Sequence, residues 1–113
     1  MYTSFGDFYL RVYLSPAGDL PPSQVPEQFT LLQNYPNPFN PSTTIMYDLP
    51  ERSKVRLLVY DILGRVVSVL KDEEEDANRY VVSFDGARLP SGVYFYRLET
   101  PAFTQTRKMV LLH

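Results

Sequence analysis

The side chains that most often carry out chemistry in proteins are scarce in this sequence. Its only histidine is the last residue, His113, and it has no cysteine. A catalytic nucleophile needs a base beside it, and most transition-metal sites need imidazole or thiolate ligands. We expect a terminal histidine to be frayed, with no neighbours to orient its ring, so it supplies neither.

Carboxylates are the remaining candidates. Five consecutive acids occupy Asp72–Asp76, and single acids stand at Asp48, Asp61 and Asp85. A calcium loop needs spaced ligands and a turn glycine, which the acidic run lacks, whereas a run of like charges is usually solvated. We therefore expect residues 71–78 to be a loop at a hairpin tip, and the single acids to lie in turns. The sequence predicts no enzyme, no metal site and no cofactor.

Charge and length limit the classes of partner. The formal net charge is -2 over 113 residues, whereas proteins that bind nucleic acid normally present a basic face. No run approaches the length of a membrane span, and no charged-then-apolar signal peptide opens the chain. We expect no nucleic-acid partner, and we expect any export signal to lie upstream of this sequence or elsewhere within it.

The elements that must position these residues are strands. Nine tyrosines, seven phenylalanines and ten prolines favour β structure interrupted by turns. Apolar residues alternate with a period of two in several segments, and no window of a dozen residues keeps a helical period. We predict an all-β, seven-stranded antiparallel Ig-like β-sandwich. Its strands are expected over residues 29–33, 42–49, 54–60, 65–70, 80–84, 93–99 and 103–112.

The composition divides the chain into three parts. Residues 1–14 alternate like a strand, and we expect them to be the tail of an upstream domain or an extra edge strand. Residues 15–28 hold four prolines and little to bury, as in a linker that proteases reach easily. Residues 29–113 then form the domain.

A corner rich in proline and asparagine precedes the second strand. It includes Tyr35, Pro36, Asn37, Pro38 and Phe39. Each proline fixes its own φ and keeps the preceding residue out of helical geometry, and asparagine before proline favours a turn. We predict a rigid irregular corner anchored by its two aromatic side chains, which delivers the chain into a strand near residue 42.

Four ordered motifs resemble one known family. They are the corner at 34–45, the hairpin sequence at 60–65, the turn and strand at 89–98, and the final segment at 106–110. Together they resemble the C-terminal sorting domain, type A, of proteins exported by the type IX secretion system. Its motifs fall here on Pro36, Asn37, Pro38, Phe39, Asp61, Gly64, Arg65, Pro90, Gly92, Tyr94 and Lys108.

The resemblance implies a function and partners. Such a domain is recognised by the type IX translocon, and a sortase-like cysteine peptidase usually cuts ahead of it, here in the linker. The protein that precedes it crosses the periplasm of a Gram-negative bacterium and becomes secreted or attached to the cell surface. The resemblance places translocon recognition on Gly92, Tyr94, Arg107, Lys108 and Val110, and the turn and fold motifs on the other positions. A homodimer through an exposed terminal strand is a further expectation.

An alternative function rests on two tyrosines. Tyr94 and Tyr96 share one face of the predicted sixth strand. Exposed aromatic rings on a sandwich face can stack on sugars, and carbohydrate-binding modules follow proline-rich linkers. The sequence therefore leaves open an Ig-like carbohydrate-binding or adhesion module of a secreted multidomain enzyme, although aligned tyrosines more often pack in a core.

Overall fold

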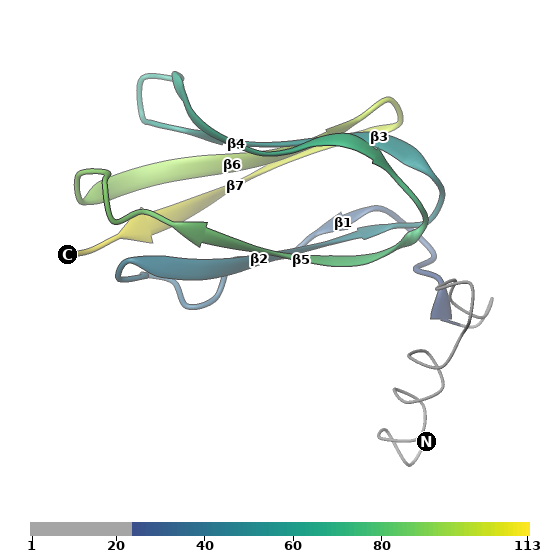
Figure 1. The fold of residues 1–113 in the computed structure, drawn as a ribbon, viewed down its shortest axis with the longest axis horizontal. Helices are drawn as coiled ribbons and strands as arrows, with labels where there is room; N and C mark the ends of the chain where they lie inside the picture. Colours follow the sequence, from purple (N-terminus) through teal and green to yellow (C-terminus); the bar gives the residue numbers. More distant parts are fainter. Residues whose placement is uncertain (1–23) are drawn as a thin grey trace, which may run out of the picture.

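The computed structural model describes residues 24–113, so the strand expected in residues 1–14 and most of the linker expected at 15–28 lie outside the described residues. The described part contains seven strands and no α-helix, which confirms the predicted all-β, antiparallel sandwich (Figure 1). The strands are β1 (Thr30–Leu31), β2 (Ser42–Leu49), β3 (Ser53–Tyr60), β4 (Val66–Glu75), β5 (Asn78–Asp85), β6 (Gly92–Thr100) and β7 (Phe103–Leu111).

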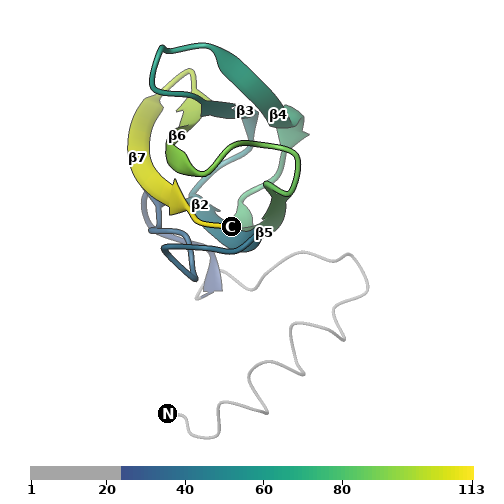
Figure 2. The same cartoon turned by 90° about the vertical axis from the view of Figure 1, so that its left-hand side faces the viewer.

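The strands form two stacked sheets. One has the order β1-β2-β5 and the other the order β4-β3-β6-β7, and every pair is antiparallel. Viewed along the strands, the two sheets close around a common interior (Figure 2). The predicted hairpins β3–β4 and β6–β7 are both present. The C-terminal strand β7 therefore lies at the edge of the four-stranded sheet.

Alternation along the strands places the core. Buried side chains recur at every second residue of β2 and β6, as the period of two predicts. Each large apolar side chain that is removed from water contributes about 1.5–3 kcal/mol. The largest fully buried side chains are Tyr47, Tyr96, Phe39, Leu31, Ile45, Leu49, Leu57, Leu98, Met109, Leu111, Val55 and Val59.

The acidic run is strand rather than loop, so the loop predicted at residues 71–78 is wrong. Strand β4 continues to Glu75, and only Asp76 and Ala77 separate it from β5. Cations of the neighbouring chain segment compensate the acids, because Lys54 Nζ lies 3.1 Å from Asp72 Oδ1. These cations lie on or near β3, which pairs with β4, and the sequence pattern alone did not show this proximity.

One acid of the run is buried between the two sheets. Glu75 on β4 accepts a hydrogen bond from the hydroxyl of Tyr47 on β2, and Lys71 Nζ lies 3.4 Å from its other oxygen. Burial, followed by the carboxylate of Glu75, raises the pKa of Tyr47 well above its ordinary value. The phenol of Tyr47 therefore stays protonated, and the hydrogen bond that it donates to Glu75 links the two sheets.

Three smaller expectations also fail. Strand β1 is only two residues long, and after it the contact with β2 continues only as an isolated bridge between Tyr35 and Thr44. Tyr35 is 80% exposed, so Phe39 is the only aromatic anchor of the corner. Asp48 lies within β2 rather than in a turn, where Arg79 on β5 binds it with two hydrogen bonds of 2.7 and 2.9 Å.

Candidate functional site

The corner before β2 lies along the C-terminal strand. We call residues 33–41 the elbow. Phe39 N donates to Val110 O at 2.9 Å, and Leu112 N donates to Phe39 O at 2.9 Å. Asn37 Oδ1 accepts from Val110 N at 3.0 Å, so a family-motif side chain completes the pairing. The elbow thus covers the outer edge of the last part of β7.

Buried hydrogen bonds hold the elbow in shape. Asn34 is buried, and its Nδ2 donates to Pro36 O at 3.1 Å and to Thr43 Oγ1 at 3.0 Å. The fully buried Tyr96 hydroxyl accepts from Asn34 N at 2.8 Å and donates to Leu32 O at 2.7 Å. The peptide bonds that precede Pro36, Pro38 and Pro41 are cis. The predicted rigid corner is therefore supported by side chains from β2 and β6.

The three residues singled out on β7 have different surroundings. Arg107 is half-buried, and its Nε donates to Leu31 O at 2.6 Å, so its side chain reaches back to β1. Lys108 is exposed, and its carbonyl accepts from Gln33 Nε2 at 2.9 Å. Val110 is half-buried and pairs with the elbow through its backbone. Of the two charged residues, Lys108 presents its charge more directly to solvent than Arg107 does.

Gly92 and Tyr94 shape the start of β6. Gly92 pairs with Leu111 and has a φ of +153°, which side-chain-bearing residues rarely adopt. Tyr94 is buried, and its hydroxyl donates to Pro90 O at 2.7 Å, which fixes the turn before the strand. A role for Tyr94 in recognition would therefore act through this turn rather than through direct contact.

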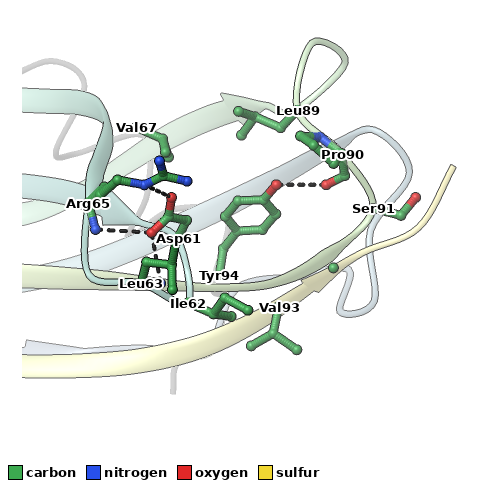
Figure 3. Close-up of a pocket in the computed structure, with 11 residues that line it drawn as sticks. Asp61, Ile62, Leu63, Arg65, Val67, Leu89, Pro90, Ser91, Val93 and Tyr94 are labelled. Carbon is green, nitrogen blue, oxygen red and sulfur yellow. Dashed lines mark hydrogen bonds and ion pairs between the residues drawn. The ribbon is translucent and has the colours of Figure 1, made fainter.

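A pocket of about 440 Å³ opens at the end of the sandwich that holds the C-terminus (Figure 3). We call it the end pocket. The β3–β4 hairpin lines one side with Asp61, Ile62, Leu63, Arg65 and Val67. The segment 89–94 lines the other side and brings Pro90, Gly92 and Tyr94 to the same place. Family-motif residues about thirty positions apart in the sequence thus share one site.

Asp61 organises the hairpin side of this pocket. Its Oδ1 accepts from the backbone N of Leu63 at 2.9 Å and of Arg65 at 3.0 Å, while its Oδ2 accepts from Arg65 Nε at 2.8 Å. The hydrogen bond from Arg65 N is the main cause that lowers the pKa of Asp61. Gly64 has the predicted positive φ, +83°. The loop is therefore closed by a carboxylate that stays ionised.

A family model matches most of the described residues. The model described as secretion system C-terminal sorting domain matches residues 33–112. This chain belongs to that family. It is a sorting domain of the type IX secretion system, and a protein that carries it is secreted or displayed at the cell surface. The family is a secretion signal and not a known catalytic one.

Other comparisons add little to this assignment. No curated protein matches the chain. One solved structure, PorZ, is described as an essential bacterial surface component of the type-IX secretion system of Porphyromonas gingivalis. The sorting domain is 18% identical to it, with a TM-score of 0.49, over 77% of this chain and 12% of that chain. The chain thus spans a small part of that protein's length, and the likeness carries no argument here.

The carbohydrate alternative loses the feature that suggested it. Both Tyr94 and Tyr96 are buried in the sorting domain, and their hydroxyls bind backbone atoms. Their faces pack in the core because the even positions of β6 point between the sheets. Neither ring is available to stack on a sugar.

Sequence analysis missed several residues of the site. His113 is not without neighbours, since its backbone N donates to Ser91 Oγ at 3.0 Å and its Nε2 lies 2.6 Å from Leu89 O. Gln33 and Asn34 hold the elbow but were not singled out. Ile62 and Leu63 are 70% and 71% exposed at the hairpin tip. Two large aliphatic residues inside a turn motif were the available signal, because turns normally carry polar residues.

Two kinds of site are not found within residues 24–113. No cluster of three or more His, Cys, Asp or Glu side chains in this part of the chain could hold a metal ion. No helix of the described part is long and apolar enough to cross a membrane.

Proposed function

We propose that this sorting domain directs the protein that precedes it from the periplasm across the outer membrane of a Gram-negative bacterium, and that the type IX translocon recognises β7. The observation that supports this is the extent of the family match. It begins at the elbow and ends one residue after the final strand, and these are the two segments that hydrogen-bond along the edge of the sandwich. The two ends of the matched segment are thus in direct contact in the fold.

Lys108 is the residue of β7 best placed to be recognised. Its amine is exposed and its backbone is held by Gln33, so the charge sits on an ordered strand. Arg107 instead uses its guanidinium to bind Leu31 O. A fixed cation attracts an acidic partner surface and contributes to specificity and association rate. Val110 and Gly92 would then position the strand around Lys108, and Tyr94 would act through the turn at Pro90.

We also propose that the domain is removed after export. Glu27 and Gln28, at the end of the predicted linker, are exposed. The first described residues lie at the opposite end of the sandwich from the C-terminus (Figure 1). A translocon that holds the C-terminal end would leave the linker accessible to the sortase-like cysteine peptidase. Cleavage there would release the preceding protein for attachment to the cell surface.

A homodimer through β7 would have limited room. Elbow hydrogen bonds begin at Lys108 and continue to Leu112. Strand addition at an exposed edge needs free backbone groups. Pairing between two copies would therefore use residues 104–106, the part of the edge that lies before the elbow.

The test is export of a reporter fused to residues 15–113 in a host with a type IX system. We expect surface delivery by the native fusion and periplasmic retention of the Lys108→Glu fusion. Arg88→Glu is the control, because Arg88 is an exposed cation in the turn before β6 and forms no hydrogen bond or ion pair within residues 24–113. Deletion of β7 would be a poor test, since it removes the core residues Met109 and Leu111.

Two results would contradict the proposal. Periplasmic retention of the native fusion would show that the domain is not a sufficient address. Equal surface delivery by the Lys108→Glu and native fusions would show that recognition does not use this charge. The cleavage step is checked separately by sequencing the N-terminus of the released domain, which we expect to lie within residues 15–28.

A further inference from the structure

The end pocket has the features of a binding site for a peptide. Its hairpin wall holds Ile62 and Leu63 in solvent, 70% and 71% exposed. Large aliphatic side chains that stay exposed together beside an apolar hollow are a common sign of an interaction site. Figure 3 shows Leu63 and Ile62 on the hairpin side and Leu89 and Pro90 across the pocket.

The two aliphatic side chains are held on a rigid loop. Asp61 accepts three hydrogen bonds from the loop, and two backbone bonds close it, from Asp61 N to Arg65 O at 2.9 Å and from Gly64 N to Asp61 O at 3.0 Å. The opposite wall is fixed as well, because Tyr94 donates to Pro90 O. A preorganised site loses little conformational entropy when a ligand binds.

Arg65 gives the pocket a charge preference. Its side chain is 72% exposed, and its Nε donates to Asp61 Oδ2. Among the described residues, its two terminal nitrogens have no hydrogen-bond or ion-pair partner, so they remain free to bind a carboxylate. Both oxygens of Asp61 are already engaged, and so Asp61 offers less to a cationic ligand. The polar groups left unengaged at the rim are therefore the hydrogen-bond donors of Arg65.

We propose that the end pocket binds an extended segment of a protein partner in which an aliphatic side chain stands next to a carboxylate. The aliphatic group lies against Leu63 and Pro90, and the carboxylate pairs with the terminal nitrogens of Arg65. This binding activity is distinct from recognition of β7, and its test does not require export.

The test is an amide chemical-shift titration of the full 113-residue chain, isotopically labelled. The probe is the hexapeptide Gly-Gly-Leu-Asp-Gly-Gly, acetylated and amidated at its ends, at up to millimolar concentration. We expect shifts confined to residues 61–67 and 89–94. Replacing Leu by Ser or Asp by Asn in the peptide should each weaken binding at least fivefold.

Variants of the protein complete the test. We expect Leu63→Ser and Arg65→Gln to weaken binding about tenfold, a factor that corresponds to about 1.4 kcal/mol. Val81→Ser is the matched control, because Val81 is 63% exposed on β5 of the other sheet. Lys108→Gln should leave binding unchanged, which separates this proposal from the proposed function. Absent shifts, shifts outside the pocket, or equal binding of the Asp and Asn peptides would overturn the proposal.

Discussion

Substitution of Tyr96 by phenylalanine tests whether one buried hydroxyl holds the elbow. The change keeps the ring in the core and removes only the oxygen that accepts from Asn34 N and donates to Leu32 O. Each buried polar group left without a partner costs about 1–3 kcal/mol. Asn34 is buried, whereas Leu32 is half-buried and water can reach its carbonyl. We therefore expect a loss of about 2–4 kcal/mol in the free energy of unfolding.

Urea unfolding measures this loss. A domain of this size has a urea dependence near 1 kcal/mol/M, so the midpoint should fall by roughly 2–4 M. Amide exchange at Phe39 and Val110 should also accelerate, because these groups join the elbow to β7. The slope itself should not change, since the same surface is exposed on unfolding.

Tyr94→Phe is the matched control for this substitution. It removes a hydroxyl with a single partner, Pro90 O, at an exposed turn, and we expect a loss of about 1 kcal/mol or less. If the two variants lost the same stability, within about 0.5 kcal/mol, the reasoning that the Tyr96 hydroxyl supports the elbow would be refuted.

Three further predictions concern charge, backbone and pH. Arg79→Ala should lower the free energy of unfolding in urea by about 2–3 kcal/mol, because it leaves the buried Asp48 carboxylate unpaired. The control Lys54→Ala removes an exposed ion pair and should lower it by under about 0.5 kcal/mol. Gly92→Ala should cost about 1–3 kcal/mol from its strained φ, so an export defect in this variant is meaningful only if a thermal melt shows it folded. Burial raises the pKa of Tyr96 from 10.0 to about 12, so the folded state favours the neutral phenol. The resulting contribution to the free energy of unfolding is complete below pH 10 and is lost as the pH rises toward 12. Urea midpoints across that range should fall less steeply for Tyr96→Phe than for the native chain, and equal slopes would count against this assignment.

The fold could be predicted because its signals are local. Alternation along β2, β3 and β6 gave the residues that share one face of each strand, and Gly64 marked a turn that needs positive φ. The error at residues 71–78 had a physical cause. Acidic residues repel one another in an isolated segment, but in the sheet the cations of β3 and its preceding turn lie opposite them.

The site was only partly accessible to sequence analysis. Asn37 and Phe39 were singled out in the corner and Val110 in the last strand, but nothing in the sequence indicated that they bind one another. The exposure of Tyr94 also could not be judged, because alternation tells which residues share a face but not which face meets the other sheet. Only the stacking of the two sheets decided that this face is the core.

Sequence alone thus determined the class of fold, most of the turns, and the resemblance to a sorting domain, because these depend on residue types at short spacing. Tertiary structure decided which of those residues meet. It brought the elbow against β7 and the hairpin at Asp61 against the turn at Pro90, although each pair is separated by tens of residues. It also left Lys108 and Arg65 exposed while turning Arg107 toward β1. The physical reason is that a side chain's availability to a partner depends on packing by distant segments, which short-range sequence patterns do not encode.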